Sequence, residues 1–426
     1  MNKKEQIIKY IASGEVRKEK EFLGGEYEHI LLDREGKALA YPHPRGASHI
    51  FKELTKRGWQ PEREGDHILS LRKGDHVITT EPGGQIEYSG GPKKTVLELE
   101  EDLFFFYRDI LPVLGDGDEL YCIGFQPVSS IDSIEILPKA RYHAMYDYFT
   151  THGSHSHYMM KGTAALQLSM DYKCEKDYER KYGIACRLSN IFYALFDNAP
   201  FCEGRPTDIY GWRAYIWEHT DPARSGIPKE VFGSRFGYEQ YAEFLLRTPA
   251  IFVLKNGKFS PFGGTIGEAM DEDTTTEELE HLMTMVFPDV RTKNFFEVRM
   301  VDSLPYPFNM GVIALMKNIF YNENNLDRLW NLLGDLSYKE HIRSRHELYE
   351  KGPMAKMMGK TLIRHGMDLF DALEICEDDR VYIEEILPLL EGNTLRRQMV
   401  AQWKKGYGIH DVIALSRVQR DYVEIK

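Results

Sequence analysis

The sequence lacks the features that mark secreted, membrane and metal-cluster proteins. Its five cysteines form no Cys-x-x-Cys pair, which argues against a zinc ribbon and against a disulfide framework. The opening residues, MNKKEQIIKYIASGEVRKEKEF, are charged and lack the apolar core of a signal peptide. No apolar run approaches the roughly 18 residues that a membrane span needs. We therefore expect a protein of the cytoplasm, without a membrane segment.

Signatures of nucleic-acid binding and of the common nucleotide sites are also missing. The chain has 66 acidic residues against 54 Lys and Arg, a net charge of −12, which argues against nucleic acid as a partner. It contains no Walker A sequence, and no G-x-G-x-x-G opens a helix after a strand. If such a chain uses ATP, it must hold the phosphates through metal ions and cationic side chains.

What the sequence does contain is the composition of a globular protein with a large core, 42% hydrophobic and 28% charged. Several strand-like segments are joined by hairpin-length turns, as at Lys73-Gly74-Asp75. This favours an α+β fold with a mainly antiparallel sheet over a doubly wound parallel sheet. From about Met310 the pattern is helical to the end. We expect a catalytic domain over residues 1–310 and a helical C-terminal region, 311–426, packed on it.

The stretch TTEPGGQIEYSG, residues 79–90, places two carboxylates and an amide along a predicted strand. Because side chains alternate between the faces of a strand, Glu81, Gln85 and Glu87 share one face. On a fully extended strand Glu81 and Glu87 would be about 20 Å apart. We therefore expect Glu87 rather than Glu81 to bind a cation, unless the Pro-Gly-Gly segment folds back.

Other strand-like segments carry polar faces of the same kind. GGEYEH presents Glu26 and Glu28, LQLSMD presents Gln167, Ser169 and Asp171, and FFEVRMV presents Glu297 and Arg299. Taken alone, each face could be a solvated surface. Together on one sheet, the carboxylates would repel each other unless cations neutralised them, and an all-oxygen ligand set suits Mg²⁺ or Mn²⁺. An arginine two residues from such a carboxylate suits phosphoryl chemistry, because a guanidinium binds phosphate oxygens bidentately.

Further cations stand in turn or aromatic contexts: Lys139 and Arg141 in PKARY, Arg213 in GWRAYIW and Arg224 in HTDPARSG. Spacing alone leaves open whether they bind an anion or form surface salt bridges. The histidine run THGSHSHY has the spacing of a transition-metal site, but no cysteine or second histidine pair completes it, so a mobile polar loop is favoured. No base accompanies any cysteine, which argues against a catalytic thiol.

The chain resembles a known enzyme family through motifs that occur in the family's order: TTEPGGQIEYSG, GFQPV, PKARY, ALQLSMDY, ALFDNAPFCEGRPT, WEHTDPARSGIP, FGYEQYAEFLL and FPDVRTKNFFEVRMVD. The family is that of plant-type glutamate–cysteine ligases, within the glutamine-synthetase-like carboxylate–amine ligases. The resemblance runs from about Gly24 to about Asp302. It implies a catalytic domain whose antiparallel sheet forms a funnel-like active-site face, with helices on the other side.

The resemblance also implies a reaction. The family joins the γ-carboxylate of glutamate to the amine of cysteine through γ-glutamyl phosphate, with ATP and Mg²⁺, for which Mn²⁺ can substitute. It implies the following roles: metal ligands Glu26, Glu28, Glu87 and Glu297; catalytic residues Glu297 and Arg299; phosphate or nucleotide contacts Gln167, Ser169, Lys139, Arg141 and Arg299; substrate contacts Glu81, Gly83, Gly84, Gln85, Arg213 and Arg224. Ser169 stands where the family usually has Asn.

The acceptor amine is the part of this reaction that the motifs leave open, because none of their residues declares it. One alternative is a γ-glutamyl ligase that uses another amino acid or amine. Another is an inactive relative that binds ATP or glutamate, although the retained carboxylates and Arg299 argue against it. We expect glutamate and cysteine as substrates, no nucleic-acid or membrane partner, and a monomer or homodimer.

Overall fold

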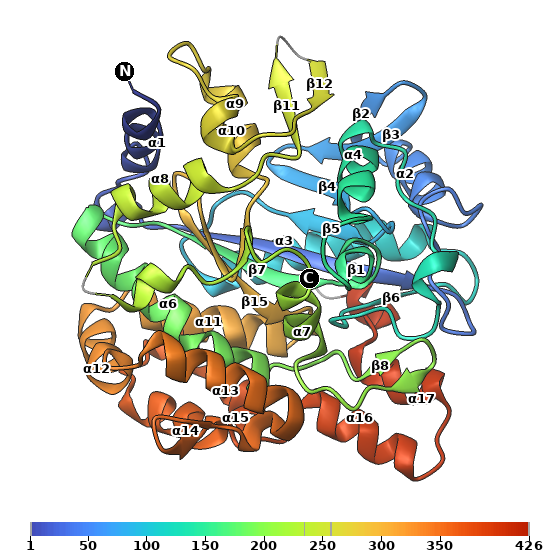
Figure 1. The fold of residues 1–426 in the computed structure, drawn as a ribbon. Coiled ribbons are helices and arrows are strands. Elements are labelled where there is room, and N and C mark those ends of the chain that lie inside the picture. The colour runs from blue at the N-terminus through green and yellow to red at the C-terminus, as the bar shows by residue number, and fades with distance from the viewer. Residues whose placement is uncertain (1, 234, 256–257, 425–426) are drawn as a thin grey trace.

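A computed structural model describes residues 2–233, 235–255 and 258–424. Its centre is an antiparallel sheet of nine strands among these residues, in the order β14-β15-β7-β1-β5-β4-β3-β2, with β6 paired to the end of β1 (Figure 1). The strands are β1 (Leu23–Leu32), β2 (Gln60–Glu64), β3 (His67–Lys73), β4 (His76–Thr80), β5 (Ile86–Ser89), β6 (Glu119–Tyr121), β7 (Ala165–Met170), β14 (Val290–Thr292) and β15 (Phe296–Asp302).

The remaining strands form short pairs: β8 (Phe201–Cys202) with β9 (Arg205–Pro206), β10 (Ser225–Gly226) with β13 (Phe287–Pro288), β11 (Phe252–Lys255) with β12 (Lys258–Pro261), and β16 (Lys356–Met357) with β17 (Lys360–Thr361). The helices are α1 (Lys3–Ala12), α2 (Ala47–Thr55), α3 (Val96–Ile110), α4 (Ala140–Phe149), α5 (Ser156–Gly162), α6 (Glu175–Leu195), α7 (Trp212–Glu218), α8 (Tyr238–Arg247), α9 (Ile266–Ala269), α10 (Thr276–Met283), α11 (Phe308–Phe320), α12 (Glu323–Leu333), α13 (Tyr338–Lys351), α14 (Leu362–Ala372), α15 (Glu377–Leu390), α16 (Leu395–Lys404) and α17 (Ile409–Ile413). In the part of the chain that the structure describes, no helix combines the length and the apolar character that crossing a membrane requires.

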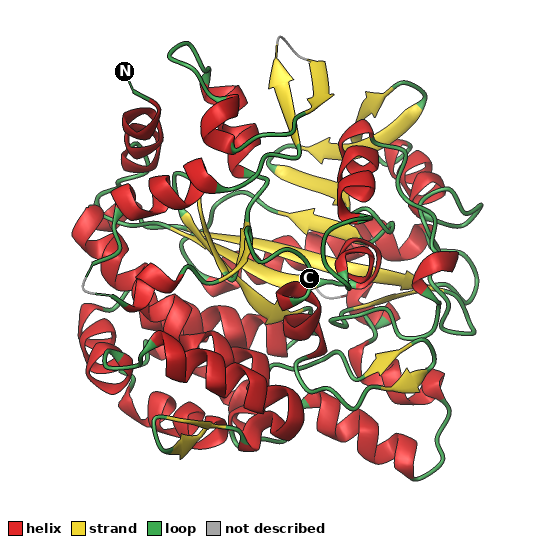
Figure 2. Ribbon diagram, in the orientation of Figure 1, coloured by secondary structure: helices red, strands yellow, loops and turns green. Residues whose placement is uncertain are grey.

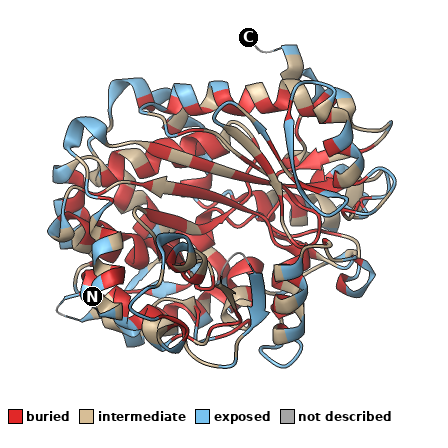
Figure 3. Cartoon of the chain, turned by 90° about the horizontal axis from the view of Figure 1, so that it is seen from above, coloured by how far each residue is buried: buried red, intermediate tan, exposed pale blue. Residues whose placement is uncertain are grey.

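The two faces of the sheet differ because its strands alternate apolar and polar residues. On the apolar face, the ring of Tyr88 in β5 stacks on Phe106 of α3 with the ring centroids 4.6 Å apart. The ring of Phe296 in β15 meets Phe320 of α11. Helix α3 begins at a capping box made by Thr95 and Glu98, and its apolar residues then face the sheet. Figure 3 shows the strands largely buried, with exposed residues gathered on the outer helices and loops.

The polar face is covered only around its margin, by α4, α5, α7 and the segment after α10, and this leaves a hollow over the middle strands. Helices α11 to α17 lie in the lower half of the view in Figure 1, where Figure 2 shows mostly helix, whereas α1, α2 and α8 to α10 lie in the upper half. The predicted α+β fold with a mainly antiparallel sheet is therefore confirmed. The added feature is the helical margin that encloses the polar face.

The stretch 79–90 is not one continuous strand. It is a hairpin in which β4 ends at Thr80, which pairs with Ile86 at the start of β5. The amide of Glu81 donates to the carbonyl of Gln85 at 2.9 Å and closes the Pro-Gly-Gly turn. The segment does fold back, so Glu81 reaches the same hollow as Glu87.

Candidate active site

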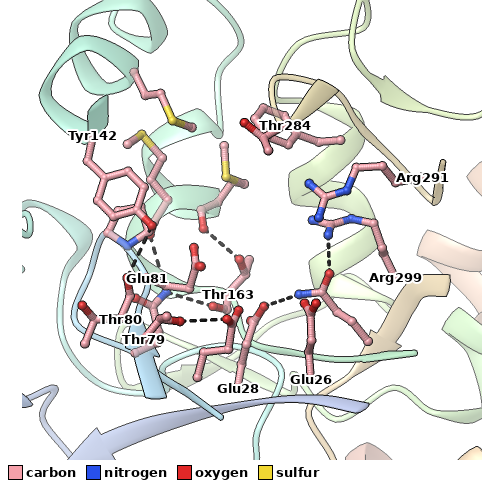
Figure 4. Close-up of a pocket in the computed structure, with 18 of the residues that line it drawn as sticks. Glu26, Glu28, Thr79, Thr80, Glu81, Tyr142, Thr163, Thr284, Arg291 and Arg299 are labelled. Carbon is pink, nitrogen blue, oxygen red and sulfur yellow. Dashed lines mark hydrogen bonds between the residues drawn. The ribbon is translucent and has the colours of Figure 1, made fainter. Parts of the chain in front are cut away.

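A cavity of about 290 Å³ lies over the polar face of the sheet (Figure 4). The strand register builds its floor, because Glu28 of β1 lies opposite Glu87 of β5, and Glu26 lies opposite Gln167 of β7. The predicted site residues that line the cavity are Glu26, Glu28, Glu81, Gln85, Glu87, Lys139, Arg141, Gln167, Arg213 and Arg299. Polar residues from widely separated parts of the sequence thus meet at one place.

The floor carries carboxylates that stand close to one another without a cationic partner. Burial, reinforced by neighbouring carboxylates, raises the pKa of Glu26 and of Glu28 to about 8, and that of Glu87 to about 7. Glu87 accepts a hydrogen bond of 2.8 Å from Thr79 Oγ1. The nearby guanidinium groups pair with Glu297 instead. The carboxylates of the floor therefore repel one another, and a cationic ligand would neutralise their charge.

Glu297, predicted to be a metal ligand and a catalytic residue, is not among the residues that line the cavity. It is fully buried beneath the cavity, and its Oε2 lies 2.8 Å from both Arg291 Nη2 and Arg299 Nη1. Burial opposes its ionisation, but the two guanidinium groups hold the pKa of Glu297 well below its usual range. Its oxygens are already committed, so in this structure Glu297 is the anion that fixes Arg291 and Arg299 in place.

Arg299 joins the floor to this buried pair through a chain of hydrogen bonds. Its Nη1 donates to the side-chain oxygen of Gln167, and Gln167 Nε2 donates to Glu28 Oε1 at 2.6 Å (Figure 4). The amide of Ala165 donates to the other oxygen of Glu28 at 2.7 Å. Gln167 therefore orients an arginine and a carboxylate at once, and β7 sets their spacing.

A divalent cation fits this donor set if a ligand completes its coordination. The described residues contain no group of three or more Asp, Glu, His or Cys side chains placed to hold a metal ion by themselves. Mg²⁺, however, is usually bound through one or two carboxylates, with waters and substrate phosphates as the other ligands. Glu26, Glu28 and Glu87 offer such oxygens, and their raised pKa values reflect the charge that a cation would neutralise. The histidine run belongs to no metal-binding group either.

Cations stand on two sides of the cavity. On one side, Lys139 and Arg141, at the start of α4, lie near Glu81. Burial raises the pKa of Glu81 even though these two cations act to lower it. On the other side, Arg291 and Lys293 join Arg299, and Figure 4 shows Arg291 and Arg299 across the cavity from Glu81. Arg291 and Lys293 are not among the site residues predicted from sequence. Their signal was the R-x-K spacing just before FFEVR: Arg291 lies in β14, the strand paired with β15, and Lys293 directly follows that strand.

The two glycines of the opening motif do not line the cavity. A Cβ at Gly83 would lie 2.4 Å from the carbonyl oxygen of Lys161, and one at Gly84 would lie 2.6 Å from the amide nitrogen of Tyr41. Gly84 also has φ of +89°, which disfavours any side chain. These glycines, predicted to contact substrate, let the turn pack against protein backbone.

The two arginines predicted to contact substrate lie in different places. Arg224 is fully buried, with its Nε 2.7 Å from Asp221 Oδ2 and its Nη1 donating to the carbonyl of Met285, so it is a structural residue outside the cavity. Arg213 lines the cavity and donates from Nη2 to the carbonyl of Arg299 at 2.9 Å. Its Nε and Nη1 are buried without a hydrogen-bond partner within the described chain, and Nη1 lies 3.9 Å from Asp302 Oδ1, so Arg213 shares its charge with that buried carboxylate.

Ser169 lies in a second hollow, of about 410 Å³, which shares Glu26 with the cavity. Its walls are mostly apolar and are formed in part by Val16, Phe22, Leu23, Pro92, Met170 and Phe295. The two hollows thus meet at the metal-ligand candidate Glu26, one largely charged and the other largely apolar.

The chain was compared with solved structures, with protein families and with known sequences, and each comparison found related proteins. The fold is similar to that of a glutamate–cysteine ligase from Francisella tularensis solved in complex with AMP, with a TM-score of 0.60 at 11% identity over 95% of this chain and 88% of that one. The pattern of glutamate–cysteine ligase family 2 matches residues 22–381. The chain is 31% identical to the chloroplastic glutamate–cysteine ligases of Nicotiana tabacum, over 82% of this chain and 69% of the relative, and of Medicago truncatula, over 88% and 74%. The chain therefore belongs to the glutamate–cysteine ligase family.

These relatives also correct the expectation of a cytoplasmic location. The ligases from Nicotiana tabacum, Medicago truncatula and Arabidopsis thaliana are all named as chloroplastic. That finding contradicts the cytoplasmic assignment, which rested on the lack of a secretory signal peptide and of a membrane span and did not distinguish the cytoplasm from a plastid.

Proposed function

We propose that this protein is an ATP-dependent ligase that joins the γ-carboxylate of glutamate to the amine of cysteine through γ-glutamyl phosphate. One observation carries the proposal beyond family membership. The carboxylates Glu26, Glu28 and Glu87, which form no ion pair within the described part of the chain, share a cavity with Arg299, whose Nη1 donates to both Glu297 and Gln167. Acidic oxygens for a cation and a fixed guanidinium for phosphate are what transfer of a phosphoryl group requires.

ATP and glutamate have separate places in this proposal. The apolar hollow beside Ser169 suits the purine ring, and its junction at Glu26 directs the phosphates toward Arg291, Lys293 and Arg299. The opposite cations, Lys139 and Arg141, then suit the α-carboxylate of glutamate, which revises the phosphate-binding role expected for them. Arg213 offers a further cation near Glu28, whose charge it partly offsets.

Glu26, Glu28 and Glu87 would hold Mg²⁺, or Mn²⁺ in its place, together with phosphate oxygens. The ion would supply positive charge that offsets the charge of the β- and γ-phosphates. The remaining requirements fall to the protein: to align glutamate with the γ-phosphorus, to stabilise the transferred group, and to exclude water from the acyl phosphate.

Two bond exchanges complete the reaction. An oxygen of the γ-carboxylate attacks the γ-phosphorus, and the bond from that phosphorus to ADP breaks while Arg299 contacts the equatorial oxygens. The neutral amine then attacks the acyl carbon, loses a proton, and releases phosphate that keeps the attacking carboxylate oxygen. Neither step needs a nucleophilic side chain, in keeping with the absence of any Cys, Ser or His from the residues that line the cavity.

We also propose that the helical C-terminal region, 311–426, supports a catalytic domain over residues 1–310. Arg345 of α13 donates to Asp289 Oδ2 at 2.8 Å, immediately before β14, and both residues are buried. Arg396 of α16 lies 3.6 Å from Asp197 at the end of α6. The C-terminal helices thus anchor the elements that carry Arg291 and Arg299.

We expect Mg²⁺ to raise the melting temperature more at pH 8.5 than at pH 6. The folded-state pKa values of Glu26, Glu28 and Glu87, about 7 to 8, lie above the value of about 4.3 of an unfolded glutamate. Their stabilising contribution is therefore complete below about pH 4 and is lost as the pH rises through 7 to 8, when protons leave the floor. A cation restores the lost charge balance. Thermal denaturation with Mg²⁺, against NaCl of equal ionic strength, measures the difference, and an equal or smaller shift at pH 8.5 would contradict it.

The acceptor is tested by glutamate- and ATP-dependent phosphate release across a panel of amines. We expect cysteine to give the highest kcat/KM, 2-aminobutyrate a lower one, and ammonia and diamines the lowest. A pocket that distinguishes a thiol from a methyl group does so by only about 1–3 kcal/mol, so 2-aminobutyrate should react measurably. A higher kcat/KM for ammonia or a diamine than for cysteine would leave the ligase chemistry standing but refute the acceptor. EDTA should abolish release with every amine.

A further inference from the structure

One wall of the cavity is apolar, and no step of the proposed reaction uses it. Met145 of α4 and Met159 and Met160 of α5 line it, with exposed fractions of 6%, 7% and 1%. Trp217 of α7 and Phe287 continue this wall, their ring centroids 5.6 Å apart. In Figure 4 the sulfur atoms lie together on the side of the cavity away from Glu26 and Glu28.

The other substrates leave this wall free. The purine ring of ATP has its own apolar hollow beyond Glu26, and the phosphates require the charged floor. The amino and carboxylate groups of glutamate require Glu81, Lys139, Arg141 or Arg213, of which Arg141 and Arg213 lie one helical turn from Met145 and Trp217. The acceptor must enter this same cavity to reach the acyl carbon. An uncharged side chain on that acceptor is the group that an apolar wall would stabilise.

We propose that Met145, Met159 and Met160, with Trp217 and Phe287, form the pocket for the side chain of the acceptor amino acid, and that this pocket selects a small uncharged side chain of thiol size. This inference rests on the proposed ligase function and names the specificity of its second step. Methionine is unbranched and polarizable, so it packs closely around a sulfur atom and offers no hydrogen-bond donor to a charged group. A charged acceptor side chain would lose hydration there without a partner.

The pocket is fixed to the hairpin of the opening motif. Gln85 Nε2 donates to the carbonyl of Thr163 at 2.9 Å, and Thr163 Oγ1 donates to the carbonyl of Met159 at 2.8 Å. A Cβ at Gly162 would lie 2.4 Å from the ring of Phe125, so α5 packs too closely against that ring to shift inward. Gln85, expected to contact substrate, thereby ties the methionine-bearing helix to the strand that carries Glu87.

The test compares acceptors of increasing size in pocket variants. We expect Met159→Ala and Met145→Ala to raise kcat/KM for norvaline relative to cysteine by about 10–200-fold, the range for one methylene group in an apolar pocket. The KM for glutamate, and phosphate release with saturating hydroxylamine in place of an amino acid, should not change. Met354→Ala, at a surface methionine with 59% exposure, is the matched control and should leave every ratio unchanged.

Other outcomes overturn the inference in distinguishable ways. If the variants raise the KM for glutamate while the norvaline-to-cysteine ratio stays constant, the wall contacts the methylenes of glutamate instead. If no ratio changes, the pocket lies elsewhere. If an alanine variant fails to fold, Met159→Leu, which conserves volume but adds a branch, carries the same test and should lower the ratio for norvaline. Wild-type protein that releases no phosphate with glutamate and ATP would refute the proposed function itself.

Discussion

We expect Arg299→Met to lower kcat by about 10³–10⁵-fold while the protein stays folded, the range measured when a phosphoryl-transfer site loses its arginine. The guanidinium of Arg299 lines the cavity and is held by Glu297 at 2.8 Å and by Gln167. Its loss removes charge that stabilises the transferred phosphoryl group. Glu297 keeps Arg291 as a partner, so the buried anion remains neutralised. Steady-state kinetics, with circular dichroism as the check on folding, measure the effect.

The control for this variant is Arg343→Met, at an exposed arginine of α13 that pairs with Glu340. We expect it to change neither activity nor stability appreciably, because exposed ion pairs contribute little. A loss of less than about tenfold in Arg299→Met would show that Arg299 does not contact the transferring phosphate.

Glu297→Gln should lower the free energy of unfolding by about 3–5 kcal/mol, as well as lowering kcat by at least about 10²-fold. The substitution leaves two guanidinium groups, Arg291 and Arg299, buried without the anion that neutralises them. Arg299 would then lose its fixed position in the cavity. Urea denaturation measures the stability and initial rates measure kcat.

Glu377→Gln is the matched control, because Glu377 pairs with Arg380 at the surface of α15 with 88% of its side chain exposed. Unchanged or increased stability of Glu297→Gln would indicate repulsion by the floor carboxylates rather than attraction by the arginines. In that case Glu297 would return to the role of metal ligand that its sequence motif suggested.

The polar face could be predicted from sequence because strand alternation is a local property. Glu26, Glu28, Glu87 and Gln167 each follow from a period of two within one segment, and antiparallel pairing then brings the segments together. Sequence could not predict the partner of each charge. Glu297 pairs with Arg299, which lies within FFEVR, and with Arg291, which lies in β14. Nothing within FFEVR indicates that second arginine.

Arg224 and Gly83 are two further residues whose contacts could not be predicted from sequence. The spacing of Arg224 is equally compatible with a substrate contact and with a buried pair to Asp221, and only the packing of the 221–224 turn decides between them. Gly83 was predicted to contact substrate, yet the close approach is made by the backbone of Lys161, a residue far away in the sequence. The packing around Gly83 is long-range and leaves no local pattern.

Transfer of ¹⁸O from glutamate to phosphate shows whether glutamate is activated by phosphorylation of its γ-carboxylate. Glutamate with ¹⁸O in the γ-carboxylate is incubated with ATP, Mg²⁺, cysteine and the protein, and the released phosphate is analysed by mass spectrometry. The attacking oxygen should leave with the phosphate, so each phosphate should carry one ¹⁸O atom. Phosphate without ¹⁸O, formed along with γ-glutamylcysteine, would contradict the acyl-phosphate route and with it the role assigned to Arg299.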